Sequence, residues 1–91
     1  MPDWELISFV KASEVRLSIL ESLNEKVQTP TELKELLGVP ISRISAILKE
    51  LSEKDLIENL TPDRRKSKMF SLTKKGKTIL LEIKKVSEGG N

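Results

Sequence analysis

The stretch TPTELKELLGVPISRISAILKELSEKDLIENLTPDRRKSKMFSLT, residues 29–73, decides the fold of this chain. It opens with the signals of a short helix. Thr29 is a favourable N-cap, Pro30 takes the first helical position, and Glu32 stands where a capping box needs it. Gly38 is expected to end this helix, because glycine adopts the left-handed conformation without steric cost.

The helix between these signals carries a single apolar stripe. Leu33, Leu36 and Leu37 recur at helical spacing, so we expect all three to face a core. Val39-Pro40 then turns the chain, since a residue before proline favours the extended conformation. Two helices joined by about three or four residues that include a glycine match the helix-turn-helix pattern.

A second helix is predicted over residues 41–53. Its apolar residues recur at steps of three and four and define a buried side: Ile41, Ile44, Leu48 and Leu51. Ile47 falls at the border between the two sides of the helix. The spacing therefore predicts an amphipathic helix with one side free.

The free side of this helix is small and hydrogen-bonding, with no acid before Glu50. A helix that enters the DNA major groove needs donors for base edges and small residues for close approach. Arg43 is the strongest candidate for a base contact, and Lys49 is better suited to a phosphate. An ordinary solvated helix face has a similar composition, so the pattern alone leaves both interpretations open. The free side consists of Ser42, Arg43, Ser45, Ala46 and Lys49.

Two short strand-like runs follow, at residues 56–60 and 69–72. The loop between them, residues 61–68, has turn chemistry at Pro62-Asp63 and holds four cations against one acid. Such a hairpin tip can be a solubilising charge run. Directly after two helices of this kind, we interpret it as a loop that grips DNA phosphates or enters the minor groove.

The order of these parts resembles the winged helix-turn-helix transcription regulators of the ArsR and MarR kind. The resemblance covers roughly residues 9–86 and is carried by VRLSILESL at 15–23, by residues 29–58, and by MFSLTKKGKTIL at 69–80. It implies a mostly α fold with a small β-hairpin, in the order α-α-α-α-β-β-α. It also implies a recognition helix at about 41–53, a wing at about 56–72, and a C-terminal dimerisation helix at about 74–87.

The resemblance further implies a sequence-specific, double-stranded DNA-binding transcriptional regulator that acts as a homodimer. The recognition helix would enter the major groove, and the basic wing would contact phosphate or the minor groove. The alternative is a winged-helix protein–protein interaction module that does not bind DNA. The predicted DNA contacts are Thr29, Thr31, Pro40, Ser42, Arg43, Ser45, Ala46, Lys49, Arg64, Arg65, Lys66 and Lys68.

Two departures from the family pattern affect these expectations. Lys54-Asp55 stands where the family often has Lys-Gly, so Asp55 is expected to adopt the left-handed conformation that aspartate tolerates. Metal-sensing members use Cys and His ligands, and this chain has neither residue. We therefore expect no metal site, and no set of residues points to an effector ligand.

The flanking segments are expected to form helices as well. Asp3 or Ser8 can open the first, and Ser13 can cap the next, although a single longer helix through residue 12 is also possible. The first and last helices carry more apolar surface than a small core buries, which favours a homodimer interface. A tryptophan that only closes the monomer core is the alternative. The predicted interface residues are Trp4, Ile7, Phe9, Leu80, Leu81 and Ile83.

The charge is distributed unevenly along a chain of 91 residues, which is the length of one small domain. Residues 1–39 hold four basic and seven acidic residues, a net charge of −3. Residues 40–75 hold nine basic and five acidic residues, a net charge of +4. The positive charge thus coincides with the predicted recognition helix and wing, which favours a nucleic-acid partner.

Several function classes lack the residues they need. Without histidine, cysteine or a glycine-rich phosphate loop, we find no catalytic site and expect neither an enzyme nor a cofactor. The sequence contains no apolar run long enough to span a membrane and no secretory leader. We therefore expect a cytoplasmic protein that does not contact membranes.

Overall fold

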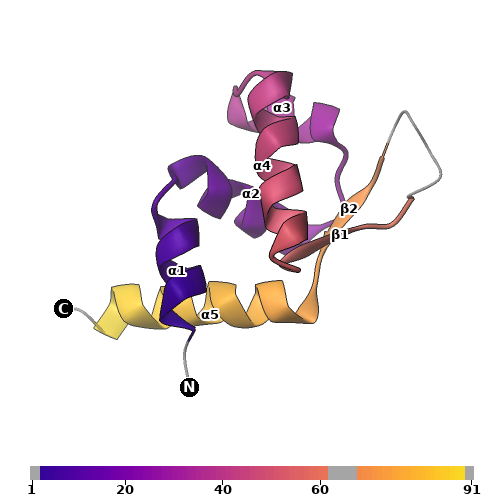
Figure 1. The fold of residues 1–91 in the computed structure, drawn as a ribbon. Helices are drawn as coiled ribbons and strands as arrows, with labels where there is room; N and C mark the ends of the chain where they lie inside the picture. Colours follow the sequence, from indigo (N-terminus) through magenta and orange to yellow (C-terminus); the bar gives the residue numbers. More distant parts are fainter. Residues whose placement is uncertain (1–2, 62–67, 90–91) are drawn as a thin grey trace.

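The computed structural model describes residues 3–61 and 68–89, and within these ranges the chain forms five helices and one two-stranded sheet (Figure 1). The element order is the one predicted, so the mostly α fold with a β-hairpin is confirmed. The elements are α1 (Trp4–Lys11), α2 (Glu14–Glu25), α3 (Pro30–Leu37), α4 (Ile41–Glu53), β1 (Ile57–Asn59), β2 (Phe70–Leu72) and α5 (Lys74–Gly89).

A side-chain cap starts each of the helices α1 and α2. The Asp3 carboxylate accepts a hydrogen bond from the Leu6 amide at 3.1 Å and starts α1. Ser13 has extended backbone and accepts from the Arg16 amide at 3.4 Å, which starts α2. Because Ser13 leaves the helical conformation, the two segments are distinct helices and not one long helix.

The start and end of α3 are as predicted. The Thr29 hydroxyl accepts from the Glu32 amide at 3.1 Å, and the Glu32 carboxylate accepts from the Thr29 amide at 2.9 Å, which completes the capping box. Gly38 ends the helix in the left-handed conformation with φ +65°. The prediction for Leu36 was wrong, because its side chain is 62% exposed. Its side chain lines an open hollow beside polar residues of α2, among them Ser18 and Glu21, and is not packed into the core.

The buried side of α4 is confirmed except at its first residue. Ile44, Leu48 and Leu51 are buried, and Ile47, which the spacing left at the border, is buried as well. Ile41 was predicted to face the core but is 42% exposed. It is the first residue of the helix, directly after the turn that follows α3, and its position on the apolar side does not bring it into the core.

The hairpin strands are shorter than the predicted runs. β1 and β2 pair antiparallel, with Ile57 opposite Leu72 and Asn59 opposite Phe70. Asp55, just before β1, has φ +61°, as predicted. An unpredicted bridge joins Phe70 to Gln28 on the segment between α2 and α3, through backbone hydrogen bonds of 2.9 and 3.2 Å. These hydrogen bonds connect the wing to the segment that leads into α3, the first helix of the helix-turn-helix.

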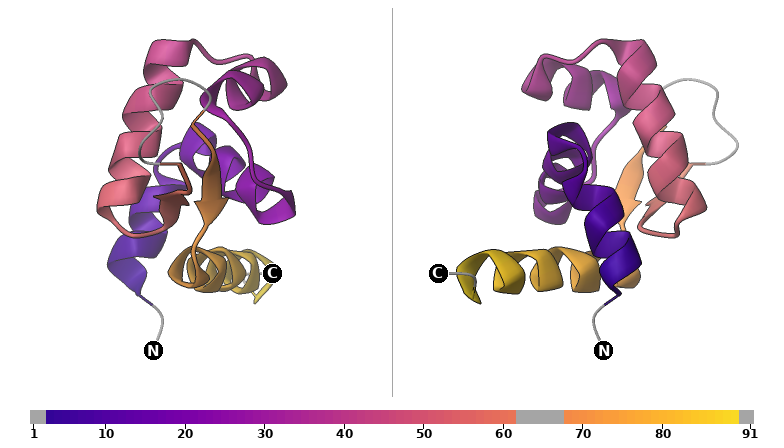
Figure 2. Two further views of the ribbon diagram at one scale, coloured as in Figure 1. Left: turned by 90° about the vertical axis from the view of Figure 1, so that its right-hand side faces the viewer. Right: turned by 60° about the vertical axis from the view of Figure 1, so that its left-hand side comes forward.

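One hydrophobic core holds the helices and the sheet together. Figures 1 and 2 show α5 lying along one end of the molecule, across the direction of α4, with α1 packed against it. Leucine and isoleucine dominate the core, as the low aromatic content of 3% requires. Its buried residues are Leu6, Ile7, Val10, Ile19, Leu20, Leu23, Leu33, Ile44, Ile47, Leu48, Leu51, Leu56, Ile57, Phe70, Leu72, Ile79, Leu80 and Ile83.

The base of the wing is connected to α5 by Thr73. Its hydroxyl donates to the Asp55 carbonyl at 2.6 Å and accepts from the Gly76 amide at 3.0 Å, so Thr73 caps the start of α5. Across residues 3–61 and 68–89, no helix is both long enough and apolar enough to cross a membrane.

Candidate nucleic-acid interface

The outer side of α4 is a polar surface carried by a helix whose inner side is fixed in the core. Ile44 and Leu51 have no exposed surface, so α4 is held along its length. All five predicted contact residues on the helix are exposed: Ser42, Arg43, Ser45, Ala46 and Lys49. At 100° per residue they cover an arc of about 160° around the helix axis. We call this arc the outer face of α4.

The residues of the outer face differ in their position around the helix axis, and therefore in the neighbours that they contact. Ser42 and Lys49 lie near the middle of the arc, Ser45 lies at the edge toward the wing, and Arg43 lies at the opposite edge. Glu50 follows Ala46 by one turn and is paired with Arg16 of α2, with a nitrogen–oxygen distance of 3.2 Å. The first acid on the helix is therefore compensated by a cation, and the outer face keeps its positive character.

A hollow of about 440 Å³ lies between α4 and the sheet. It brings together three of the predicted residues, Ser45 and Lys49 from α4 and Lys68 from the chain just before β2. Leu48 and Phe70 contribute apolar side chains to it. Its remaining lining residues are Pro30, Ser52 and Asn59. The two lysines thus line one hollow although they are far apart in the sequence.

Sequence reasoning did not single out Ser52 or Asn59. Ser52 stands seven residues after Ser45, two helical turns on, so the helical period placed it on the same edge of α4. Asn59 gave no comparable signal, because its position depends on how β1 packs against α4. Its amide oxygen accepts from the Thr61 amide at 2.8 Å, which shapes the chain where it leaves β1.

The other predicted contacts lie around the turn between α3 and α4 and in the wing. Thr31 and Pro40 are exposed, whereas Thr29 is half-buried and its hydroxyl serves the cap of α3. Lys68 is exposed. The remaining three predicted contacts, Arg64, Arg65 and Lys66, lie outside the described residues.

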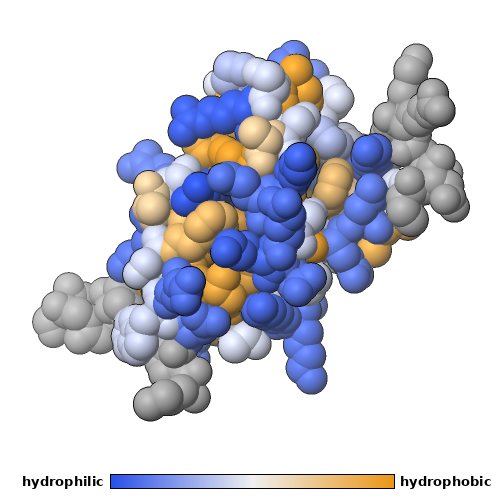
Figure 3. Space-filling view, viewed as in Figure 1, coloured by the Kyte–Doolittle hydropathy of each residue, from blue (hydrophilic) through white to orange (hydrophobic). Residues whose placement is uncertain are grey.

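Polar and apolar side chains are distributed unevenly over the surface of the molecule. In Figure 3 hydrophilic side chains cover most of the surface over α4, and apolar residues emerge on the side of α1. In the described part of the chain, no three His, Cys, Asp or Glu side chains gather closely enough to hold a metal ion. The chemistry that the outer face can offer is hydrogen bonding and positive charge.

A family model matches almost the whole chain. The model described as "Methanogenesis regulatory protein FilR1, N-terminal domain" matches residues 4–88, which is nearly the whole chain. Among curated proteins, no match to this sequence was found.

Solved structures of transcription regulators have the same fold. The regulator BldR from Sulfolobus solfataricus is similar with a TM-score of 0.74 and 27% identity, over 85% of this chain and 56% of that one. The MarR family regulator SP03579 gives 0.74 and 29%, over 86% and 53%. A MarR mutant from E. coli, complexed with operator DNA, gives 0.71 and 26%, over 87% and 58%. The chain therefore spans little more than half the length of each of these proteins.

Proposed function

Because this chain belongs to the family of the methanogenesis regulatory protein FilR1 N-terminal domain and has the fold of MarR-family regulators, we propose that it binds double-stranded DNA in a sequence-specific manner and regulates transcription. In this proposal α4 is the recognition helix and enters the major groove. The basic wing contacts phosphates or the adjacent minor groove.

The observation that carries the proposal is the contrast between the two sides of α4. One side is locked into the core by Ile44 and Leu51, and the other presents hydroxyls, a small alanine and two cations to solvent. A rigid helix with short polar side chains can approach base edges closely, and Arg43 can bond the two acceptors of guanine. The E. coli MarR protein, similar over 87% of this chain, was solved with operator DNA, which supports the same use of this fold.

The proposed contact between the wing and DNA phosphates rests on the positive charge of the wing and of the neighbouring part of α4. Lys68 and Lys49 line the same hollow beside α4, so a phosphate strand that passes there would meet both cations. The sequence adds Arg64, Arg65 and Lys66 close to Lys68. Phosphate contacts of this kind set affinity and orientation, whereas contacts from α4 set sequence preference.

The first test is DNA binding measured at increasing salt concentration. When random-sequence duplexes are selected for binding to this protein, a defined motif should be enriched. The affinity for that motif should fall steeply as the salt concentration rises, with a log–log slope of about −0.9 for each neutralised phosphate. A chain that enriches no motif and shows no salt-dependent shift with duplex DNA would instead be a protein–protein interaction module.

Replacement of Arg43 by alanine tests whether α4 is the recognition helix. We expect the variant to lose about 1–3 kcal/mol of binding free energy and its preference at one base pair, because a bidentate contact to a base edge is removed. Competition binding with each single-base variant of the enriched motif measures both quantities. Lys34→Ala removes one exposed cation from α3 and serves as the control, with a small and sequence-independent effect. An Arg43→Ala variant with unchanged affinity and preference would exclude Arg43 from the interface.

We propose further that the protein acts as a homodimer through α1 and α5, which pack against each other. Trp4 and Leu81 are each 59% exposed, and water is a poor environment for side chains of this size. Ile7, Leu80 and Ile83 are buried inside the single chain, and Phe9 is half-buried against its core. Of the six residues assigned to the interface, Trp4 and Leu81 therefore offer the main surface to a partner.

The double substitution Trp4→Ser/Leu81→Ser should separate the subunits. We expect a dimer at micromolar concentration in sedimentation equilibrium, and a dissociation constant raised by about 30-fold or more in the variant, because a buried aromatic anchor contributes about 2 kcal/mol or more. Leu36→Ser removes a comparably exposed apolar side chain from α3 and should leave the association unchanged. A wild-type chain that sediments as a monomer at that concentration would rule the dimer out.

A further inference from the structure

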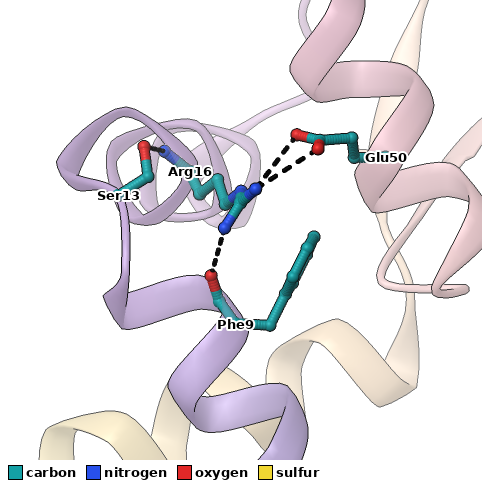
Figure 4. A network of polar contacts seen from close by, with 4 residues as sticks. All are labelled: Phe9, Ser13, Arg16 and Glu50. Atoms are coloured by element: carbon teal, nitrogen blue, oxygen red, sulfur yellow. Dashed lines mark hydrogen bonds and ion pairs between the residues drawn. The ribbon is translucent and has the colours of Figure 1, made fainter.

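One side chain, Arg16 of α2, contacts both α1 and α4. Its Nη1 atom donates to the Phe9 carbonyl at the end of α1 at 2.7 Å. Its Nη2 atom donates to the Glu50 carboxylate of α4 at 3.2 and 3.4 Å. The guanidinium carbon also lies 4.0 Å from the centroid of the Phe9 ring (Figure 4). The three helices therefore meet at a single planar group.

The geometry requires arginine rather than a cation in general. Arginine presents several N–H donors in a rigid fork, so two of its nitrogens can bond different helices at the same time. A lysine in this position keeps the charge but has one nitrogen, which cannot reproduce both contacts and the stacking on Phe9. The Arg16 side chain is 19% exposed and that of Glu50 is 42% exposed, so the guanidinium is largely shielded from solvent and the carboxylate is not.

The contact lies next to the outer face of α4. Glu50 follows Ala46 by one turn and Arg43 by two turns, along the edge of that face. Lys54, one further turn along, has its ammonium 5.4 Å from the centroid of the Phe9 ring. The edge of α4 that carries Arg43 is thus attached, through Glu50 and Lys54, to the last residues of α1.

We infer that Arg16 is a positioning residue that fixes the recognition helix relative to α1. This inference rests on the proposed function and adds to it a route by which α1, the helix that bears Trp4, controls how well α4 discriminates between DNA sequences. A shift of α1 moves the Phe9 carbonyl, and Arg16 then bonds either α1 or α4 less well. The orientation of the outer face changes as a result, while the net charge of the protein stays the same.

The test separates orientation from charge. The probes are a labelled duplex enriched from random-sequence DNA by the wild-type protein and a scrambled duplex of the same length and composition. We expect Arg16→Lys to lower the ratio of the two affinities about five- to tenfold, with binding to the scrambled duplex nearly unchanged because the charge is kept. Glu50→Ala should lower the same ratio by a similar factor. The double variant should lose no more than either single variant, because both remove the same contact.

Ser13→Ala is the matched control. It removes the hydrogen bond that the Ser13 hydroxyl accepts from the Arg16 backbone amide and lowers thermal stability, but it keeps every atom of the guanidinium contacts. Below its melting temperature it should keep the wild-type affinity ratio. A general loss of folded protein lowers binding to both duplexes equally and leaves the ratio unchanged, so the ratio reports orientation alone.

Hydrogen exchange of the α4 amides in the free protein provides a readout that needs no DNA. Arg16→Lys should accelerate exchange in the second half of α4 more than in the other core helices, whereas Ser13→Ala should accelerate exchange of the core amides to a similar extent in all of them. An unchanged affinity ratio in Arg16→Lys, additive losses in the double variant, or unchanged exchange in α4 would each overturn the role of Arg16. A wild-type chain without preference for any duplex would overturn the proposed function, and the exchange measurement would still decide whether Arg16 fixes α4.

Discussion

Gly76→Ala is expected to destabilise the protein by about 2–3 kcal/mol, although alanine is the better helix former by about 1 kcal/mol. A Cβ atom on Gly76 would overlap the carbonyl oxygen of Leu56 and lie 2.6 Å from the Leu72 Cδ1 atom. The Leu56 carbonyl also accepts from the Thr73 amide at 3.1 Å, so the Leu56 carbonyl cannot move away from Gly76 without losing this hydrogen bond. The added methyl group therefore forces α5 away from the base of the wing.

Thermal and urea unfolding measure this effect directly. For a domain of this size, the expected loss corresponds to a fall in melting temperature of about 10–20 °C. Lys75→Ala, at the exposed neighbouring position in the same helical turn, should stay within about 0.5 kcal/mol of the wild type. A Gly76→Ala protein that is as stable as the wild type would mean that α5 does not pack this closely against Leu56.

The helix ends could be predicted from the sequence because the interactions that fix them are local. Thr29 and Glu32 satisfy each other's backbone amides within one turn, and Gly38 needs only its own φ angle. The left-handed Asp55 was predicted in the same way. In each case the residues that decide the conformation stand within three positions of one another, so a single sequence contains all the information.

Burial at the ends of elements was less predictable. Leu36 and Ile41 have the right spacing for a core position, but their side chains are 62% and 42% exposed. Helical periodicity gives the direction of a side chain and not the length of the helix that it faces. The same limit applies to the dimer interface, since spacing cannot separate an apolar residue that closes the monomer core, such as Ile83, from one that remains exposed, such as Leu81.

The contacts that join distant segments gave no signal in the sequence. Arg16 and Glu50 are 34 residues apart, and the bridge between Gln28 and Phe70 spans a similar separation. Both depend on the tertiary arrangement of helices and sheet, which no local pattern determines. The outer face of α4, in contrast, could be predicted because one helix carries all of it.

Removal of the two wing arginines, Arg64→Ala/Arg65→Ala, is expected to have the largest effect on DNA affinity. If both contact phosphates, the variant should bind the enriched and the scrambled duplex roughly tenfold to a hundredfold more weakly at low salt. The log–log salt slope should become shallower by about 1.8, since each phosphate contact contributes about 0.9. The sequence preference should remain, because α4 is unchanged.

The control is Lys84→Ala/Lys85→Ala, which removes the same charge from exposed positions on α5. If only the net charge mattered, both double variants would lose affinity and salt dependence equally. We expect the α5 variant to keep nearly the wild-type slope, because these lysines lie on α5 and not beside the hollow between α4 and the sheet that Lys49 and Lys68 line. Equal slopes in the two variants would show that DNA attraction is not localised at the wing, and the assignment of the wing as a phosphate contact would have to be abandoned.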